Sequence, residues 1–327
     1  MRRPSWALIG VLFAFDSRWR GRYTSRFSSR QGDTDNMDQA ISKAAALVEA
    51  LSYIQRFHNK VVVVKIGGSI MDDEKVLSNI LTDIVFMNYV GMQPILVHGG
   101  GKAINQAMET AGLQPQWVMG RRYTDERTLA IAEHVLCNQI NKFIVNFIQA
   151  QGCEVMGLHS LSSVVLFGEK MYLQAEDGRR IDLGLVGEVK TVNARLLQLL
   201  VQADSIPCIA TIARDQAGGK LNVNADTAAG AVAAAMQADK LVVVSDTHGI
   251  RRDVKDPESL LRSLNVEQIE EMVKSGAISS GMLPKVEACI TALRAGCSKT
   301  HIIDGRIPHS LLLEIYTEAG IGTEIVL

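Results

Sequence analysis

From residue 60 onward, short apolar runs alternate with longer stretches of helical periodicity, and this alternation constrains the fold more than any other feature. The clearest run is VVVVKI at 61–66. Nearly continuous apolar strands separated by helices indicate a mostly parallel sheet covered by helices on both faces. We therefore predict an α/β fold, an open αβα sandwich. The expected strands are 61–66, 94–98, 154–158, 206–212, 241–245 and 300–303.

Between these strands, apolar residues recur at intervals of three and four, as is typical of helices with one buried face. One segment, 164–189, breaks the alternation and reads as short antiparallel strands, with Asp177-Gly178 as the hairpin turn. Two lobes that meet near residue 190 are plausible. The expected helices are 73–89, 102–111, 125–151, 192–203, 225–237, 266–275, 283–295 and 308–319.

The N-terminal segment 1–36 is expected to lie outside this core, either unstructured or as an extension. Its apolar run 6–15 is flanked by arginines, and Asp16 is the only acidic residue among the first 31. This composition fits a transit or signal sequence, but it also fits an upstream extension, with Met37 as an alternative start. An upstream extension predicts a cytoplasmic protein, whereas a transit peptide predicts an organellar one. An amphipathic helix over 37–59 is expected to take part in oligomerisation.

Composition excludes several classes of partner. The formal net charge is −1, which gives no basic field for nucleic acid or an anionic membrane. No apolar run approaches the roughly 20 residues needed to span a bilayer. The five cysteines are odd in number and form no C-x-x-C pair, so we interpret them as reduced, packed thiols of an intracellular protein.

Glycine-containing turns follow three of the predicted strands and are the first sign of a ligand. They are KIGGS (65–69), VHGGGKAIN (97–105) and SDTHGI (245–250). In parallel sheets, ligands bind beyond the carboxyl ends of the strands. Glycines there allow backbone N–H groups to approach phosphate oxygens, and a following helix N-terminus adds positive charge. One such turn is usually only a turn, but three, with a lysine in the first, favour phosphate binding.

Common phosphate-binding motifs do not fit this sequence. A P-loop needs Gly-Lys followed by Ser or Thr, and neither Gly-Lys pair, at 101–102 or 219–220, has one. A Rossmann fingerprint beginning at Gly99 fails at Ile104. The H-R-D and D-F-G motifs of protein kinases are also absent. The phosphate must therefore be held in another way.

Polar residues before an alanine-rich helix add to the candidate site. Asn222, Asn224 and Asp226 alternate, so an extended chain would point all three to one face. Asp226 could simply cap the helix, whereas the two amides are not needed for a cap and suit a polar ligand. Lys285 lies in the first turn of a later helix, where the macrodipole disfavours a cation. It is either a solvated surface lysine or one directed at a phosphate.

Two arginines in GRRYTDE (120–126) are candidates for binding a carboxylate. Arg121 and Arg122 precede a long predicted helix, and a guanidinium can donate two parallel hydrogen bonds to a carboxylate. Paired arginines are most often solvated, so this signal is weak by itself.

Taken together, six segments occur in an order that resembles the amino acid kinase family, and within it the branch that phosphorylates N-acetyl-L-glutamate. The resemblance runs from about residue 60 to the C-terminus. It implies an N-terminal lobe (60–190) that binds acetylglutamate and a C-terminal lobe (191–327) that binds ATP with Mg²⁺. The γ-phosphoryl group would pass to the substrate's side-chain carboxylate, giving N-acetyl-L-glutamate 5-phosphate in arginine biosynthesis. The segments are KIGGS, LVHGGGKAIN, GRRYTDE, NVNADTAAG, SDTHGI and SGMLPKVEA.

The resemblance also implies roles for individual residues. Lys65 and Lys285 would stabilise the transferring phosphoryl group from the substrate and nucleotide sides, and Asp226 would orient them. No protein metal ligand is expected, because Mg²⁺ would be bound through the nucleotide. A carboxylate acceptor is already ionised at neutral pH, so no general base is needed, and His98 is interpreted as structural. Substrate would contact Gly99, Gly100, Arg122 and Asn222, and ATP would contact Gly67, Gly68, Asp246, Thr247, His248, Gly249, Ile250, Arg251, Ala277, Ile278 and Ser279.

The helix before the core and the segment 301–325 resemble the arginine-inhibited members that form ring-shaped homohexamers, trimers of dimers. By this resemblance, His301, Glu314 and Gly322 would lie near a site for L-arginine. Arg121 departs from the family pattern, since many relatives carry an apolar residue there. Two alternatives remain. The first is another kinase that uses the same phosphate machinery, such as an aspartate kinase, a glutamate 5-kinase or a carbamate kinase. The second is a non-catalytic arginine or nucleotide sensor on the same fold.

Overall fold

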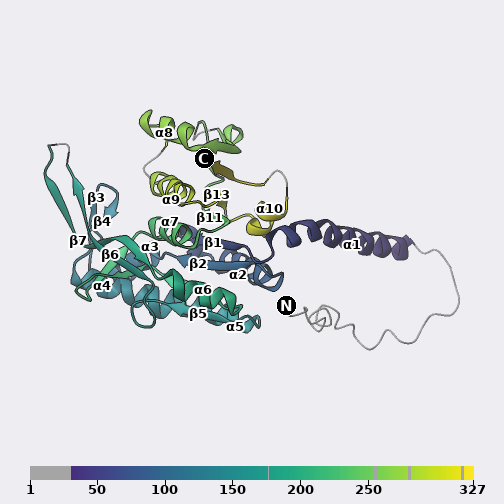
Figure 1. The fold of residues 1–327 in the computed structure, drawn as a ribbon, viewed down its shortest axis with the longest axis horizontal. Coiled ribbons are helices and arrows are strands. Elements are labelled where there is room, and N and C mark those ends of the chain that lie inside the picture. Colours follow the sequence, from purple (N-terminus) through teal and green to yellow (C-terminus); the bar gives the residue numbers. More distant parts are fainter. Residues whose placement is uncertain (1–30, 176, 254–255, 279–280, 318–319) are drawn as a thin grey trace. The chain divides into compact units, whose positions relative to one another are not determined.

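The computed structural model describes residues 31–327, apart from 176, 254–255, 279–280 and 318–319 (Figure 1). The described chain forms two units, which divide after Glu49. The first holds most of helix α1 (Gln31–Phe57). This helix begins six residues before the predicted start at Met37, and the polar segment 31–36 contains no proline that would prevent it. Four large apolar side chains of its first part are exposed: Met37, Ile41, Leu47 and Val48.

An eight-stranded sheet is the centre of the second unit, residues 50–327 (Figure 1). Its order is β12-β14-β13-β11-β1-β2-β8-β5. Every neighbouring pair is parallel except β13 and β14, which confirms the predicted, mostly parallel sheet. The edge strand β12 and its neighbour β14, both short, were not predicted. The strand bounds are β1 Val61–Ile66, β2 Gln93–His98, β5 Val155–Leu158, β8 Ile206–Ala210, β11 Lys240–Ser245, β12 Ser263–Asn265, β13 Lys299–Asp304 and β14 Thr323–Val326.

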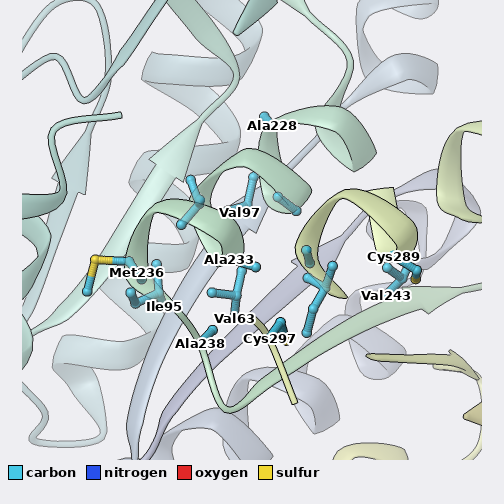
Figure 2. Close-up of a cluster of buried hydrophobic side chains, with 14 of the residues drawn as sticks. Val63, Ile95, Val97, Ala228, Ala233, Met236, Ala238, Val243, Cys289 and Cys297 are labelled. Carbon is cyan, nitrogen blue, oxygen red and sulfur yellow. The ribbon is translucent and has the colours of Figure 1, made fainter. Parts of the chain in front are cut away.

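Helices pack on both faces of this sheet, and the strand residues alternate between the two. On β1, Val63 belongs to the cluster formed with α7 and α9 (Figure 2), whereas Val62 and Val64 belong to the cluster formed with α2, α5 and α10. This is the two-residue period of a strand that is buried on both faces. The helices are α2 Glu74–Tyr89, α3 Gly101–Thr110, α4 Glu126–Glu133, α5 Lys142–Ala150, α6 Ala194–Gln202, α7 Ala225–Met236, α8 Val266–Lys274, α9 Leu283–Arg294 and α10 Ser310–Tyr316, with short 3₁₀ turns η3 Gly68–Asp72 and η5 Pro257–Ser259.

The segment that interrupts the alternation forms a small closed barrel. Strands β6 (Leu166–Gln174) and β7 (Arg180–Val192) pair antiparallel, as predicted. Strands β9 (Ile212–Arg214) and β10 (Lys220–Val223) complete the barrel in the order β10-β7-β6-β9. These two strands were not predicted, and the expected strand 206–212 is divided between β8 and β9. The boundary that we predicted near residue 190 falls within the second unit, close to the end of β7.

The helix expected at 125–151 is not uniform. Between α4 and α5 the backbone widens into a π-helix, η4 (His134–Asn141). Such segments are rare and often occur at functional sites. All five cysteines are buried and free. Within the described ranges, no helix has the length and apolar character needed to cross a membrane.

Candidate functional site

The candidate site lies where β1 and β2 end side by side. Ile66 pairs with His98 at the carboxyl ends of the two strands, so the turns that follow face the same space. A cavity of about 590 Å³, here called the first cavity, opens there. It brings together residues from segments far apart in the sequence: Lys65, Gly67, Gly68, Gly99, Gly100, Arg122, Asn222, Asp226 and Lys285.

Two lysines and a carboxylate form the charged centre of the first cavity. The Lys65 Nζ lies 2.8 Å from Asp226 Oδ1, and the Lys285 Nζ lies 3.8 Å from Asp226 Oδ2. Burial opposes ionisation of this carboxyl group, but the two ammonium groups hold the pKa of Asp226 below its usual value. The trio therefore carries one net positive charge in a largely buried place, which suits an anionic ligand.

Gly67 explains how the Lys65 side chain reaches the cavity. A Cβ atom at Gly67 would lie 2.6 Å from the Lys65 Nζ, so any larger residue would displace the ammonium group. Gly68 has a φ of 68°, a conformation that glycine adopts without strain. The first glycine thus leaves room for the lysine itself, which differs from its predicted role as a contact of ATP.

The second turn brings backbone groups to the same cavity. Gly99 donates its N–H to the carbonyl of Ile66 at 2.9 Å, which ties the two turns together. A Cβ atom at Gly100 would lie 2.5 Å from Ile140 Cδ1 of the π-helix, so the π-helix side chains press directly against this glycine. Helix α3 begins at the next residue, and its N-terminus adds partial positive charge at the cavity wall.

Arg122 is the more buried of the two arginines, and its neighbours fix its position. The Nη2 donates to the carbonyl of Gly101 at 3.0 Å, and the guanidinium lies 4.8 Å from the ring centre of Trp117. Burial lowers the pKa of the Arg122 guanidinium, although the group stays charged at any physiological pH. A buried, oriented guanidinium at the cavity wall can bind a carboxylate. Sequence reasoning missed Trp117, which lies five residues before the arginine in the antiparallel strand pair β3 (Trp117–Val118) and β4 (Arg121–Arg122).

The helix cap of α7 differs from the prediction. Asn224 is the N-cap, and its Oδ1 accepts from the Thr227 N–H at 3.0 Å, so the expectation that neither amide serves as a cap was wrong. Asp226 lies in the first turn, which frees its carboxylate for the lysines. Asn222 lies on β10, where its Nδ2 donates to Thr124 Oγ1 at 3.3 Å. All three residues line the first cavity.

A second cavity, of about 220 Å³, lies next to the first. Gly281 and Leu283 line the first cavity and Met282 lines the second, so one short segment separates them. The Thr247 Oγ1 is buried without a hydrogen-bond partner among the described residues. Of the residues expected to contact ATP, this cavity is lined by Asp246, Thr247, His248, Gly249, Ile250, Arg251, Ala277 and Ile278.

Two expected contacts lie elsewhere, and one falls outside the described residues. Gly67 and Gly68 line the first cavity instead of the second, and Ser279 is not among the residues that the structure describes. No sequence pattern pointed to Arg306, which lines the second cavity. Its Nη2 lies 2.7 Å from Asp304 Oδ2. In the described ranges, no group of three or more His, Cys, Asp or Glu side chains is placed to hold a metal ion.

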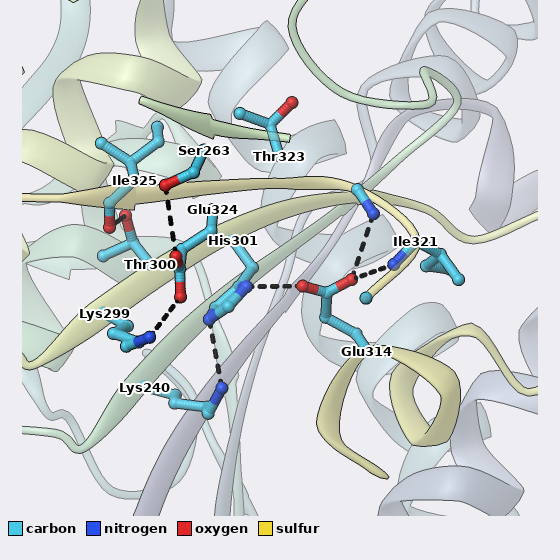
Figure 3. A network of polar contacts seen from close by, with 12 residues as sticks. Lys240, Ser263, Lys299, Thr300, His301, Glu314, Ile321, Thr323, Glu324 and Ile325 are labelled. Atoms are coloured by element: carbon cyan, nitrogen blue, oxygen red, sulfur yellow. Dashed lines mark hydrogen bonds and ion pairs between the residues drawn. The ribbon is translucent and has the colours of Figure 1, made fainter. Parts of the chain in front are cut away.

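A third cavity, of about 740 Å³, lies at the amino ends of β11 and β13, where Lys240 and Lys299 line it. His301, Glu314 and Gly322 line it. Hydrogen bonds connect Glu314 to His301 (Figure 3) and to Gly322. The His301 Nδ1 lies 2.6 Å from Glu314 Oε1, and Glu314 Oε2 accepts from the Gly322 N–H at 3.1 Å. Lys240 Nζ lies 3.2 Å from the His301 Nε2, so a buried chain of polar groups joins the sheet to α10.

Comparison with known proteins decides the family. Residues 60–304 match the model of the amino acid kinase family. This chain belongs to the amino acid kinase family. The predicted resemblance is confirmed, and the chain is a phosphotransferase with the amino acid kinase fold.

Several curated amino acid kinases are similar over nearly their whole length. An acetylglutamate kinase of Methanococcus maripaludis strain C7 is 46% identical over 288 residues, covering 87% of this chain and 98% of the relative. One from Symbiobacterium thermophilum is 43% identical over 289 residues, covering 88% and 99%. One from Methanocaldococcus jannaschii is 44% identical over 294 residues, covering 89% and 98%.

Solved structures share the fold at lower identity. An N-acetylglutamate synthase of Neisseria gonorrhoeae, complexed with coenzyme A and N-acetyl-glutamate, has a TM-score of 0.73 at 23% identity. The match covers 87% of this chain and 63% of the synthase chain, which is less than two thirds of its length. A carbamate kinase of Giardia lamblia bound to AMP-PNP has a TM-score of 0.58 at 16% identity, covering 82% of this chain and 98% of that one. These likenesses confirm the amino acid kinase fold.

Proposed function

We propose that this chain is an acetylglutamate kinase, which transfers the γ-phosphoryl group of ATP to the side-chain carboxylate of N-acetyl-L-glutamate. The observation that carries the proposal is the Lys65–Asp226–Lys285 trio, whose net positive charge lies in a cavity with an arginine on one side and a second cavity on the other. The curated relatives at 43–46% identity bear the same name. The product would be N-acetyl-L-glutamate 5-phosphate, an intermediate of arginine biosynthesis.

The chemistry needs positioning and charge neutralisation more than a covalent protein intermediate. The acceptor carboxylate is ionised at neutral pH and attacks phosphorus directly, forming a new O–P bond while the bond to the ADP oxygen breaks. Lys65 would neutralise the phosphoryl oxygens from the substrate side and Lys285 from the nucleotide side. Asp226 would orient both ammonium groups before substrate arrives, and the Lys285 Nζ also donates to the Gly281 carbonyl at 3.1 Å.

Substrate and nucleotide would approach the two lysines from opposite sides. The buried guanidinium of Arg122 would pair with the α-carboxylate of acetylglutamate, and Asn222 would help to bind the substrate. Gly100 would contribute its backbone N–H group, whereas Gly99, whose own N–H donates to the Ile66 carbonyl, would only line the first cavity. ATP would occupy the second cavity, where the buried Thr247 hydroxyl is available as a hydrogen-bonding group. Mg²⁺ would enter with the nucleotide, because Asp226 is already committed to the lysines.

We also propose that L-arginine inhibits the enzyme by binding in the third cavity. Glu314 and Glu324 provide carboxylates on its wall, which suit a guanidinium or an α-ammonium group. An N-acetylglutamate synthase structure from Neisseria gonorrhoeae contains L-arginine, so an arginine complex is known for a protein of this fold. Saturating L-arginine should therefore lower the rate, and an unchanged rate would contradict this part of the proposal.

The proposed assembly is a homohexamer, a trimer of dimers in which the first part of α1 contacts other subunits. Exposed Met37, Ile41, Leu47 and Val48 support this proposal, because a soluble protein rarely leaves such a set uncovered. The proposed compartment is the cytoplasm, with an organelle as the alternative if residues 1–36 act as a transit peptide.

A substrate panel tests the proposed reaction. ADP release would be measured with MgATP and, in turn, N-acetyl-L-glutamate, L-glutamate, L-aspartate and carbamate. Turnover with acetylglutamate and at most traces with the others is expected. Turnover with glutamate or aspartate and none with acetylglutamate would place the chain in another branch of the family. Lys65→Met is the matched control, since it keeps an unbranched side chain only one atom shorter and removes the charge.

A further inference from the structure

A histidine and an asparagine lie buried beneath the glycine turn that follows β2. His98 is the last residue of β2, Asn141 is the last residue of the π-helix, and their exposed fractions are 0% and 1%. The Asn141 Nδ2 lies 3.0 Å from His98 Nε2, and the His98 Nδ1 lies 3.2 Å from the carbonyl oxygen of Gly99. Neither side chain lines the first cavity, so both act on the turn from its buried side.

The hydrogen-bond partners determine where the imidazole proton lies. The Asn141 amide group also lies 3.0 Å from the carbonyl oxygen of Cys208. A carbonyl oxygen can only accept, so the atom facing it must be the amide nitrogen, whose second N–H then donates to His98 Nε2. With Nε2 as an acceptor, the proton of a neutral imidazole is on Nδ1, and it donates to Gly99. Burial lowers the pKa of His98 to about 4, which keeps the ring neutral in this arrangement.

Holding the Gly99 carbonyl also orients the next N–H group. The carbonyl of Gly99 and the N–H of Gly100 belong to one peptide unit, and the described chain has no cis peptide bonds. In a trans peptide these two groups point in opposite directions. When His98 holds the carbonyl toward the protein interior, the Gly100 N–H is directed away from it, toward the side where the cavity lies. Two neighbouring glycines would otherwise let this peptide rotate easily.

We propose that His98 is a positioning residue for phosphoryl transfer: together with Asn141 it fixes the Gly99–Gly100 peptide so that the Gly100 N–H faces the transferring group. This inference rests on the proposed function, because it requires the reaction to take place in the first cavity. The Asn141 bond to Cys208 on β8 anchors the pair to the sheet, and Ile140, its neighbour on the π-helix, packs against Gly100. The π-helix thus supports the turn through two adjacent residues.

Two variants of His98 separate positioning from simple packing. In His98→Asn, the amide nitrogen lies close to the place of Nδ1 and can still donate to Gly99, whereas His98→Leu fills a similar space and cannot donate. The loss of one oriented N–H donor lowers kcat by about 10²-fold, so His98→Leu should show this loss with an unchanged KM for ATP. His98→Asn should recover at least about tenfold of it. Equal kcat values in two folded variants would overturn the positioning role.

A spectroscopic measurement on the unmodified enzyme makes the test independent of variant folding. ¹⁵N NMR of histidine-labelled protein distinguishes Nδ1–H from Nε2–H imidazoles, and the His98 signal is the one that His98→Asn removes. We expect Nδ1–H at neutral pH, and a proton on Nε2 or on both nitrogens would overturn the inference. A wild-type enzyme without turnover would overturn the proposed function, and this positioning role with it. An active wild-type enzyme whose two variants have equal kcat would overturn the positioning role alone.

Discussion

Replacing Asp226 with asparagine should both destabilise the protein and slow the reaction. The carboxylate lies 2.8 Å from the Lys65 Nζ and 3.8 Å from the Lys285 Nζ. At an effective dielectric constant of about 20, these two pairs interact with about 6 and about 4 kcal/mol. Desolvation offsets most of this attraction, and removing one partner of a buried pair usually costs about 3–5 kcal/mol. For a chain of this size, such a loss lowers Tm by roughly 4–7 °C.

The assay combines urea unfolding with steady-state kinetics. Asp226→Asn should lose about 3 kcal/mol of unfolding free energy. Its kcat should fall by at least about 10²-fold, because the two ammonium groups are no longer held in position for the phosphoryl group. ATP should stabilise this variant more than the wild type, since two unpaired ammonium groups attract the phosphates. Glu270→Gln is the matched control: its partner Arg294 is exposed, so less than about 1 kcal/mol should be lost. Wild-type stability and turnover in Asp226→Asn would refute the reasoning.

The pH dependence of stability has a definite sign. The pKa of Asp226 is lowered in the folded protein by the two lysines, against the effect of burial. Such a carboxyl group contributes stability above its unfolded pKa, near 3.9, and the contribution is lost as the pH falls through the folded value. Urea unfolding from pH 7 down to pH 3 should therefore show a steeper loss of stability for the wild type than for Asp226→Asn. Parallel profiles would contradict this assignment.

Three further outcomes follow from the geometry. Gly67→Ala should lower kcat at least about tenfold with little change in Tm, because the new methyl group displaces the Lys65 ammonium; steady-state kinetics and thermal unfolding test this, and wild-type kcat would contradict it. Arg122→Lys should raise the KM for acetylglutamate at least about tenfold and leave the KM for ATP unchanged, since lysine cannot donate a bidentate pair; equal changes in both constants would count against the substrate assignment. Glu314→Gln should weaken inhibition by L-arginine at unchanged basal kcat, measured as the arginine concentration that halves the rate, and an unaltered concentration would exclude Glu314 from that site.

Periodicity and turn glycines were sufficient to predict the parallel sheet and the turns at the ends of β1 and β2. They succeed because strands buried on both faces must be apolar, and because ligands of such sheets bind at one edge. Lys65 drew attention because it stands in the first of these turns, but its role beside a phosphoryl group came only from the family resemblance.

Other parts of the site depend on tertiary contacts that no local pattern reveals. Asn224, and not Asp226, caps α7, because Asp226 is drawn toward two lysines from distant segments. The purpose of Gly67 becomes visible only when the lysine side chain is placed beside it. The π-helix resembles an ordinary helix in sequence, and Arg306 joins the second cavity through its contact with Asp304.

The central claim is that the side-chain carboxylate of acetylglutamate becomes an acyl phosphate between Lys65 and Lys285. Trapping the product with hydroxylamine tests it most directly, because an acyl phosphate is an anhydride that yields a hydroxamate, whereas phosphate esters do not. The wild type with N-acetyl-L-glutamate and MgATP should form hydroxamate in step with ADP, and Lys65→Met and Lys285→Met should form almost none. ADP release without hydroxamate, or undiminished hydroxamate in both variants, would contradict this account.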